Sequence, residues 1–379
     1  MAENTILDPS QAQPIRQPVE IVEPGQSPYS TVLQGKPLHA FLSSSTSPQN
    51  IELDDVARHG TINSDGVIIT IDFDKDGIYD ISPQAFKVLI ILLDKLTSQL
   101  PHPQSGTIAN ADAIQRGRIV KVTLSHYMEM CNIKDVKEAR SQLNDAIKAL
   151  YRASLEWDEQ VYERPEGKSR AIKVAKHHRM RITDHTITQE EGNPVKLGIA
   201  EFRFSFDLAE YLSKAYIMPY HPAILTVNTR YHPYSIPFGW KLCVLYNMNY
   251  GKSTQGITTV ETLLKAAKGI PRYSTIAEKG QIYARIIKPF DRDLTALLEA
   301  GVISSYWYFD DEGEKVEPPK LGGLSYTEFS KLNIQYELSN YPDQTPRIEA
   351  KSKRMKAAIS HRKNATKKKV ETTKDGAQT

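Results

Sequence analysis

The sequence is poor in cysteine and has no long apolar run. Cys131 and Cys243 are its two cysteines, and neither has a Cys or His neighbour at metal-ligand spacing, so neither a disulfide framework nor a zinc site is expected. No run approaches the roughly 18 consecutive apolar residues that a membrane helix requires. The N-terminus lacks the basic start and apolar core of a secretory signal. These absences predict a soluble cytoplasmic protein.

Residue patterns that would carry catalysis are also missing. Gly251-Lys-Ser253 copies the end of a phosphate-binding loop, but Tyr246 stands where the first glycine is required and a helical pattern precedes it. His177 and His178 are adjacent, so there is no His-x-His pair to place two metal ligands on one strand face. No recognisable nucleophile pattern is present. The sequence therefore predicts a protein that is not an enzyme and that uses no cofactor and no metal.

The charges are unevenly distributed along the chain. The formal net charge is +3, but nine cations and no acidic residue lie between 351 and 370, which leaves −6 for the rest of the chain. These cations are Lys351, Lys353, Arg354, Lys356, Arg362, Lys363, Lys367, Lys368 and Lys369. A basic tail on a mildly acidic body indicates a polyanionic partner, and few large apolar residues accompany it, so nucleic acid is favoured over a membrane. A tail that only increases solubility is the alternative.

Composition divides the chain into four segments. Residues 1–66 are predicted to be a flexible arm, because the first 50 contain seven prolines among many Gln and Ser and too few apolar residues to offset chain entropy. Residues 67–206 and 207–340 are predicted to be two folded domains, and 341–379 a basic flexible tail.

The first folded segment contains the pattern of a helix-turn-helix. A hairpin is expected from 67–73 and 78–81 around an Asp-Gly turn, followed by a helix that Ser82 caps, with Pro83 in its first turn. After a strand over 119–124, Ser125 is expected to cap a short helix to Cys131. Asp135 and Glu138 then form a capping box for a longer helix to Leu150. Strands over 154–162 and 171–175 would form a β-hairpin wing, whose second strand continues through His177, Arg179 and Arg181.

The second folded segment repeats this order more weakly. A strand over 202–206 and a helix over 235–249 precede a short helix over 260–268 and a longer helix that begins at Ile276. Pro289 is expected to kink or break that helix, and a second hairpin should start at Val302. The predicted fold class is α+β, with two tandem winged-helix domains and flexible N- and C-terminal tails.

Polar residues opposite the apolar stripes are the candidate DNA contacts. Such a helix fits the major groove, where Arg or Lys reads guanine, Asn or Gln reads adenine, and other cations hold phosphates. Any solvated amphipathic helix has a similar polar face, which is the alternative. In the first segment the candidates are Lys134, Lys137, Arg140, Ser141, Asn144 and Lys148. In the second segment they are Arg272, Tyr273, Lys279, Gln281, Arg285 and Lys288, with Lys367, Lys368 and Lys369 in the tail.

The chain resembles the plasmid replication initiators of the RepA/RepB type, which bind repeated origin sequences (iterons) through two winged-helix domains. The resemblance rests on Ile81-Ser-Pro-Gln-Ala-Phe-Lys-Val-Leu89, Val122-Thr-Leu-Ser-His-Tyr127, Arg230-Tyr-His-Pro-Tyr-Ser-Ile236, Tyr283-Ala-Arg-Ile-Ile-Lys-Pro289, Leu294 and Gly301-Val-Ile303. It implies a non-enzymatic initiator that recognises double-stranded origin repeats and recruits host replication initiation proteins and the helicase. It also implies dimers that repress their own promoter. The chain departs from the family pattern in a long insertion around 156–200 and in its tails.

Two other functions are consistent with the same sequence features. A winged-helix transcriptional regulator or partition adaptor would have the same fold, because fold does not fix function. A rolling-circle nicking replication enzyme would need acidic and histidine clusters that the sequence lacks.

Overall fold

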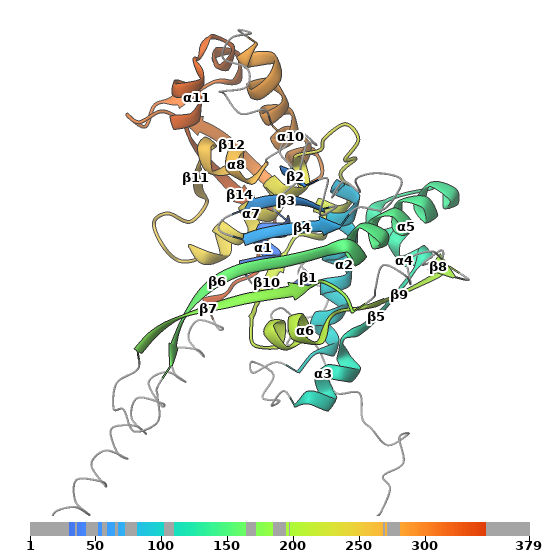
Figure 1. Cartoon of the computed structure of the whole chain (residues 1–379). Helices are drawn as coiled ribbons and strands as arrows, with labels where there is room; N and C mark the ends of the chain where they lie inside the picture. Colours follow the sequence, from blue (N-terminus) through green and yellow to red (C-terminus); the bar gives the residue numbers. More distant parts are fainter. Residues whose placement is uncertain are drawn as a thin grey trace, which may run out of the picture. The chain divides into compact units, whose positions relative to one another are not determined.

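The computed structural model describes residues 30–34, 36–42, 52–54, 59–64, 67–72, 82–101, 110–163, 172–184, 195–196, 198–267, 270 and 281–345 (Figure 1). Through Ser339 these residues belong to one compact unit, and those from Asn340 onward belong to a second. All elements named below lie in the first unit, where the described residues combine helices with four antiparallel sheets.

The first elements of this unit run from Ser30 to Tyr220. In chain order they are β1 (Ser30–Gln34), α1 (Lys36–Leu42), β2 (Glu52–Asp54), β3 (His59–Ser64), β4 (Val67–Asp72), α2 (Pro83–Gln99), α3 (Ala111–Gly117), β5 (Ile119–Thr123), α4 (Leu124–Cys131), α5 (Val136–Arg152), β6 (Ala153–Glu163), β7 (Ile172–Arg181), β8 (Val195–Lys196), β9 (Ile199–Arg203), α6 (Phe206–Ser213) and β10 (Tyr216–Tyr220). They form a five-stranded sheet of order β2-β3-β4-β6-β7, a three-stranded sheet of order β5-β9-β8, and the pair β1-β10.

The five-stranded sheet holds the predicted wing. β6 and β7 pair antiparallel from Ser154 opposite Arg181 to Glu163 opposite Ile172, which confirms the predicted hairpin. On β4, alternate residues are buried, as expected of a strand with one face on the core. β4 pairs with β3 and β6, and its predicted partner over 78–81 lies outside the described residues.

Helix α2 is the centre of the core in this part of the chain. Ser82 caps it, since its hydroxyl accepts a hydrogen bond from the Ala85 N–H at 3.3 Å, and Pro83 lies in the first turn. Its buried side chains are not confined to one face, since Val88, Ile91 and Leu92 are buried as well as Phe86 and Leu89. The helix is covered on several sides because α5, β1 and β5 all pack against it.

The prediction of a flexible arm over residues 1–66 is wrong for β1, α1, β2 and β3. β1 pairs antiparallel with β10, from Ser30 opposite Tyr220 to Gln34 opposite Tyr216. Val32 and Phe41 are fully buried, and the Phe41 ring packs edge-on against Phe86 with centroids 5.7 Å apart. The few apolar residues of this proline-rich segment are thus placed where a long-range partner covers them, which composition alone does not reveal.

The remaining elements run from Pro222 to Leu338. They are η5 (Pro222–Thr226), α7 (Ser235–Met248), β11 (Ile257–Thr259), α8 (Val260–Ala266), the π-helix η7 (Tyr283–Ile287), α10 (Lys288–Glu299), β12 (Ile303–Phe309), β13 (Lys315–Val316), η8 (Pro318–Gly323), α11 (Tyr326–Lys331) and β14 (Asn333–Leu338). Their sheet has the order β11-β14-β12-β13, in which β12 and β13 form the predicted second hairpin. Gly256 has φ +73°, and a Cβ there would lie 2.5 Å from the Tyr336 carbonyl oxygen, so this close approach requires glycine.

Hydrogen bonds from α2 connect these two stretches of the chain. The buried Lys87 ammonium donates to the Val227 carbonyl at 2.7 Å, and the Gln84 amide donates to the Thr229 hydroxyl at 2.6 Å. Burial lowers the pKa of Lys87. α6 packs against α3 and β7, which favours a domain boundary later than the predicted one at 206, although the boundaries remain predictions.

No helix in the described part of the chain is both long and apolar enough to span a membrane.

Candidate nucleic-acid interface

The segment from α4 to α5 forms a helix-turn-helix. Asn132, at the end of α4, has a left-handed backbone with φ 52°, which reverses the chain direction. Asp135 caps α5, because its Oδ1 accepts a hydrogen bond from the Glu138 N–H at 2.7 Å. The Glu138 carboxylate instead accepts from the Gln142 amide at 2.9 Å, so only half of the predicted capping box forms.

The cap of α4 differs from the prediction. Thr123, rather than Ser125, caps the helix, and its hydroxyl accepts from the His126 N–H at 3.2 Å. The helix begins at Leu124, directly after β5, so Ser125 is already within its first turn.

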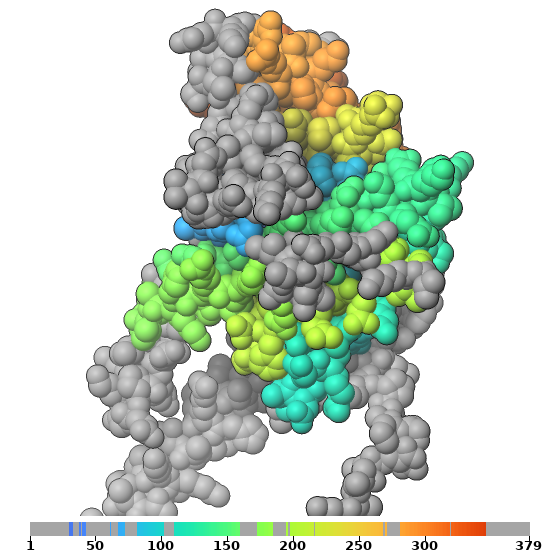
Figure 2. Space-filling view, turned by 45° about the vertical axis from the view of Figure 1, so that its right-hand side comes forward, coloured from blue at the N-terminus to red at the C-terminus, as the bar shows by residue number. Residues whose placement is uncertain are grey.

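Helix α5 buries one face and exposes a basic one. Ala139, Leu143 and Ala146 lie on the buried face, against α2 and α4. Lys134, Lys137, Arg140 and Ser141 are exposed, and Asn144 and Lys148 are half-buried. At about 100° per residue, Lys137, Arg140, Ser141, Asn144 and Lys148 fall within an arc of about 100°, beside a separate arc that holds Glu138 and Asp145. Figure 2 shows the α5 segment, in blue-green, at the molecular surface.

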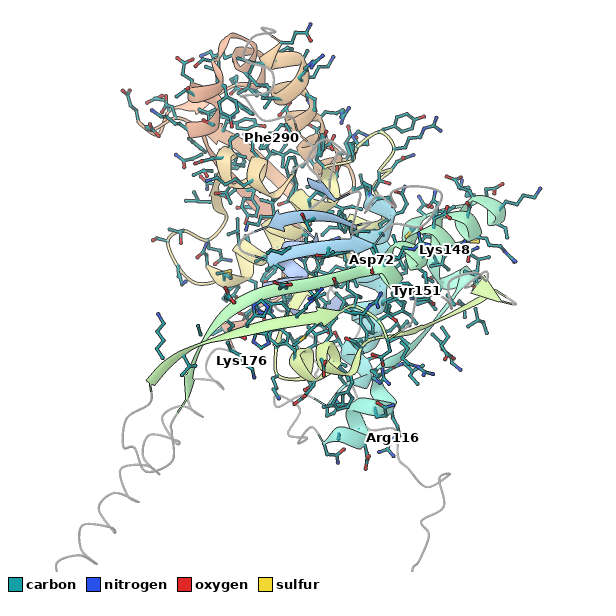
Figure 3. The ribbon with its side chains drawn as sticks, viewed as in Figure 1. Asp72, Arg116, Lys148, Tyr151, Lys176 and Phe290 are labelled. Carbon is teal, nitrogen blue, oxygen red and sulfur yellow. The ribbon has the colours of Figure 1, made fainter. Side chains whose placement is uncertain are left out.

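The cations of this face have no ion-pair partner among the described residues. No carboxylate in the described part of the chain forms an ion pair with Lys134, Lys137, Arg140 or Lys148. Lys148 is labelled on α5 in Figure 3. These four side chains therefore keep their full charge for an external anion.

The two uncharged candidates on α5 have partners within the chain. The Asn144 Oδ1 accepts from the Val195 N–H at 3.0 Å and so holds β8 beside the helix. The Ser141 hydroxyl donates to Asp145 at 3.2 Å. Asn144 was predicted to read a base, but its carbonyl oxygen already accepts this structural bond, which leaves its NH₂ group and one lone pair for a ligand.

The wing hairpin differs from α5, because some of its basic side chains lie beside carboxylates. β6 carries Glu156, Asp158, Glu159 and Glu163, and β7 carries Lys173, Lys176, Arg179 and Arg181, so the two strands have no net formal charge. The Asp158 Oδ1 lies 3.0 Å from the His177 Nδ1, and the Glu156 Oε2 lies 3.7 Å from the Arg179 Nε. Arg181 lies 3.4 Å from Asp72. Two of the four formal cations of β7, Arg179 and Arg181, thus lie within 4 Å of a carboxylate, on β6 and β4 respectively.

The second candidate helix spans residues 282–299 without a break. It begins at Ile282, continues through the π-helix η7 and becomes α10 at Lys288. The helix continues through Pro289, so the prediction that this proline breaks it is wrong. The Lys288 N–H bonds the Tyr283 carbonyl five residues back, and this π-turn places Pro289 in the first turn of α10, where a missing N–H is tolerated.

Only part of the second candidate set lies among the described residues. Gln281, Arg285 and Lys288 are exposed, and the Arg285 Nε donates to the Gln281 Oε1 at 3.0 Å. Arg272, Tyr273 and Lys279 lie outside the described residues, as do Lys367, Lys368 and Lys369.

Arg292 is a candidate that the sequence analysis missed. It follows Lys288 by four residues within α10, a spacing that places the two on one helix face. Its side chain is 43% exposed, and its Nε and Nη2 each lie 2.8 Å from the Asp293 Oδ1. Asp291 and Asp293 flank it in sequence and conceal its basic character, so the spacing was the signal that could have revealed it.

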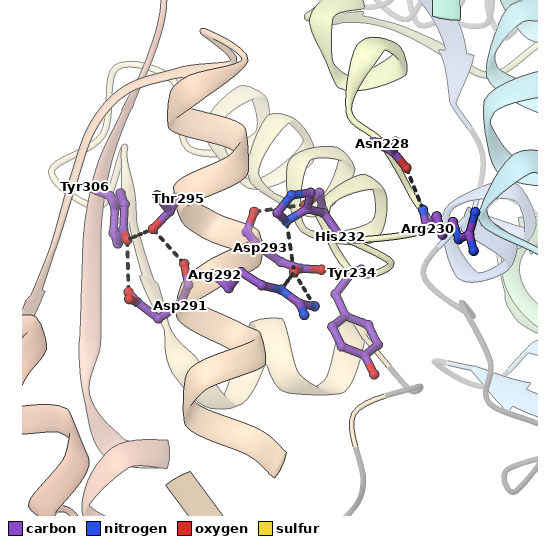
Figure 4. Close-up of polar contacts among 10 residues, drawn as sticks. Asn228, Arg230, His232, Tyr234, Asp291, Arg292, Asp293, Thr295 and Tyr306 are labelled. Carbon is purple, nitrogen blue, oxygen red and sulfur yellow. Dashed lines mark hydrogen bonds and ion pairs between the residues drawn. The ribbon is translucent and has the colours of Figure 1, made fainter. Parts of the chain in front are cut away.

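Asp293 joins α10 to the start of α7. Its carboxylate is fully buried, and its Oδ2 accepts from the Tyr234 N–H at 2.6 Å (Figure 4). His232 Nδ1 lies 3.6 Å from its Oδ1. Burial raises the pKa of Asp293, and the Arg292 guanidinium, the Tyr234 N–H and His232 counteract part of that rise.

Asp291 joins the same helix to β12. Its Oδ1 accepts hydrogen bonds from the Tyr306 and Tyr308 hydroxyls, both at 2.9 Å. Burial raises the pKa of both tyrosines, so the two hydroxyls stay protonated as donors. α10 is therefore held by carboxylates toward two different elements.

No group of three or more His, Cys, Asp or Glu side chains among the described residues is arranged to hold a metal ion.

Comparison with known proteins gives one family match. A family model described as "Initiator Replication protein, WH1" matches residues 76–218. A crystal structure of selenomethionine derivatives of domains 2 and 3 of RctB is 14% identical, with a TM-score of 0.39, over 78% of this chain and 98% of that one. A second crystal structure of RctB domains 2-3 is 12% identical, with a TM-score of 0.38, over 79% and 96% of the two chains. No curated protein sequence matches the chain.

Proposed function

We propose that the chain is a replication initiator that binds repeated double-stranded origin DNA sequence-specifically and starts replication there. The family match over residues 76–218 supports the resemblance carried by residues 81–89 and 122–127, which lie inside this segment. The other quoted motifs, between 230 and 303, lie outside it.

The basic face of α5 is the observation that carries the DNA-binding part of the proposal. A helix-turn-helix presents its second helix to the major groove, and its N-terminal residues contact base edges. Lys134, Lys137 and Arg140 lie at this end of α5 and have no carboxylate partner among the described residues. Arg140 and Lys137 suit guanine or phosphate oxygens, because both offer charged donors and no acceptor.

The region after residue 220 is proposed to be a second winged-helix domain. α7, α8, the helix over 282–299 and the β12–β13 hairpin follow the same order as α2, α4, α5 and the β6–β7 hairpin. In this proposal the helix over 282–299 reads one stretch of major groove through Arg285, Lys288 and Arg292. α5 reads or clamps the next stretch, about one helical turn away.

Phosphate contacts are proposed for the cations outside the two helices. Lys367, Lys368 and Lys369 belong to a block of nine cations that would hold the backbone without reading sequence. The wing strands are proposed to contribute less than the sequence suggested, because Arg179 and Arg181 already lie beside carboxylates.

The proposed partners follow from the family. Host replication initiation proteins and the helicase would be recruited to DNA that the initiator has bent or opened, in the cytoplasm of a plasmid-bearing cell. A homodimer would repress the promoter of its own gene.

We propose no enzymatic activity for the chain. Incubation of supercoiled origin plasmid with the protein and magnesium or manganese tests this directly. Conversion to the nicked form would instead favour a nicking replication enzyme.

Selection from a pool of random duplexes tests the specificity claim and identifies the bound sequence in the same experiment. We expect an enriched sequence that recurs as tandem repeats of about 20 base pairs, two turns of duplex, beside the gene. An electrophoretic shift assay should then show tighter binding to the repeats than to a scrambled duplex. Equal affinity for the two duplexes would remove sequence-specific recognition from the proposal.

A replication assay separates an initiator from a regulator or partition adaptor of the same fold. A plasmid that carries the gene and its repeats, but no other origin, should be maintained, and deletion of the repeats should abolish maintenance. A regulator would bind the repeats and leave replication unchanged.

A further inference from the structure

We propose that Asp293 is a positioning residue that fixes the rotation of α10 about its axis, so that Arg285, Lys288 and Arg292 face the DNA together. The inference rests on the proposed function, since it concerns how the second helix would read a base sequence. It assigns a role to a buried carboxylate that touches no ligand.

The two carboxylates of α10 lie at opposite edges of its apolar stripe. Phe290, Leu294 and Leu297 form the buried stripe. At about 100° per residue, Asp291 falls on one side of this stripe and Asp293 on the other, about 200° apart. Lys288 and Arg292 lie in the remaining arc, which faces outward.

Each edge is fastened to a different element. Asp291 bonds two tyrosine hydroxyls of β12, and Asp293 bonds the Tyr234 N–H at the N-terminus of α7 (Figure 4). The Ser235 hydroxyl adds a bond of 3.0 Å to the Asp293 carbonyl oxygen. Apolar packing is not directional, whereas hydrogen bonds on both sides of the stripe resist rotation in either sense.

The rotation of a reading helix determines whether its side chains reach base edges. The side-chain surface of a helix lies about 5–6 Å from the axis, so a turn of about 30° moves it by about 3 Å. That displacement exceeds the tolerance of a hydrogen bond, which weakens steeply outside donor–acceptor distances of about 2.7–3.2 Å. Contacts with phosphates tolerate such a shift better, because they act mainly through charge.

Asp293 also orients one of the outward cations. Two nitrogens of Arg292 bond its Oδ1, which leaves Nη1 without a hydrogen-bond partner among the described residues. The guanidinium is thereby held at the surface in one direction. An Arg fixed in this way loses less side-chain freedom when it binds a base or phosphate than a mobile one.

Asparagine substitutions at the two positions form a matched pair. Asp293 uses both oxygens, one for Arg292 and one for the Tyr234 N–H, so Asp293→Asn must lose one of these bonds. Asp291 accepts both tyrosine hydroxyls on a single oxygen, which the Asn carbonyl can replace in Asp291→Asn. Both variants remove one negative charge from the same helix, so their difference isolates positioning from electrostatics.

The experiment measures affinity for the selected repeat and for a scrambled duplex by fluorescence anisotropy, with amide hydrogen exchange over residues 282–299. For Asp293→Asn we expect the ratio of the two affinities to fall about tenfold, the loss of one good base contact, with scrambled-duplex affinity within about twofold of wild type. Exchange over 282–299 should accelerate. Asp291→Asn should keep the ratio within about twofold.

Tyr306→Phe provides a second test if Asp293→Asn does not fold cooperatively. It removes one of the two β12 hydroxyls that bond Asp291 at the opposite edge of the helix. We expect the ratio of repeat affinity to scrambled-duplex affinity to fall about threefold, without a matching loss of affinity for the scrambled duplex.

The positioning role would be overturned, and the proposed function left intact, if Asp293→Asn kept the wild-type ratio of repeat to scrambled-duplex affinity. An equal loss of affinity for both duplexes would have the same meaning. For Tyr306→Phe, if it is the variant used, a retained ratio would have the same meaning. A wild-type protein that prefers no duplex would instead remove the proposed function, and the positioning role with it.

Discussion

Helix α5 and the strands β6 and β7 follow one another in the chain, and the helix carries as many formal cations as the two strands together, four each. Three cations of the helix, Lys137, Arg140 and Lys148, have no ion-pair partner among the described residues, whereas the strands also carry four acidic residues and Arg179 lies 3.7 Å from one of them. The same residue types therefore give a surface that attracts anions in one place and a nearly neutral surface in the other.

The number of cations in a sequence thus does not measure the charge available to a ligand. A cation beside a carboxylate has lost most of its field beyond about 10 Å, where salt also screens what remains. A phosphate that approaches Arg179 must also compete with Glu156, 3.7 Å from that guanidinium. Substitutions in the two regions can test this contrast, beginning with the largest expected effect.

Charge reversal should separate the two regions clearly. Arg140→Glu should weaken binding to the repeat duplex about 30-fold, close to 2 kcal/mol, because it removes an uncompensated cation and adds a repulsive charge. Arg179→Glu, the matched reversal on the hairpin, should change the affinity by less than about threefold. Fluorescence anisotropy at fixed salt measures both. Equal losses would show that the hairpin contacts DNA as closely as the helix does.

Substitutions in the second helix should affect the sequence specificity of binding, whereas substitutions in the tail should affect affinity for any duplex. Arg285→Glu should weaken binding to the repeat about tenfold more than binding to a scrambled duplex, because a base contact is lost. Lys368→Glu should weaken both equally, because a phosphate contact carries no sequence information. Titrations of both duplexes at two salt concentrations provide the measurement. A larger loss of repeat binding for Lys368→Glu would indicate a tail-driven, non-specific protein.

Asp94 on α2 contrasts with the acids of the β6–β7 hairpin that lie beside basic side chains. No cation among the described residues forms an ion pair with Asp94, and burial raises its pKa from 3.8 to about 6, with Lys95 opposing the rise. The folded state therefore holds the proton more tightly than the unfolded state. The resulting stabilisation is complete below about pH 4 and is lost as the pH rises through 6.

Asp94→Asn should remove this dependence on pH. We expect the free energy of unfolding of the variant, relative to that of wild type, to increase by about 1 kcal/mol from pH 5 to pH 7.5. Urea unfolding at both pH values measures the difference. A constant difference between the two proteins would mean that Asp94 titrates normally in the folded state.

The smallest effect should come from releasing the cations of the hairpin. Glu156→Gln removes the carboxylate near both His177 and Arg179, so affinity for a scrambled duplex should rise about twofold at low salt, roughly 0.4 kcal/mol. The gain should disappear at high salt. Asp145→Asn on α5 provides the control for a lost negative charge near the uncompensated face. An unchanged affinity in Glu156→Gln would place the hairpin away from the DNA.

Local patterns predicted most of the helix-turn-helix. The apolar spacing and the Asp135 cap placed α5 correctly, and alternation of residues placed β6 and β7. Long-range partners were not predictable in this way. The role of Asn144 depends on Val195, 51 residues away, and the burial of Val32 depends on β10.

The unpredicted parts of the candidate site share one cause. The sequence analysis did not single out Asp293, which is buried and accepts a hydrogen bond from the N–H of Tyr234, 59 residues earlier. The continuity of the helix through Pro289 depends on a π-turn, which leaves no trace in apolar periodicity. Charge compensation across the wing depends on register, which composition does not fix.

The pairing of β1 with β10 has a consequence for synthesis of the protein. Ser30 lies opposite Tyr220, 190 positions later, so the strand leaves the ribosome long before its partner exists. At about 5–20 residues per second, this interval lasts about 10–40 s. Until then Val32 has no strand to cover it, so β1 can take its native place only after synthesis has passed β10.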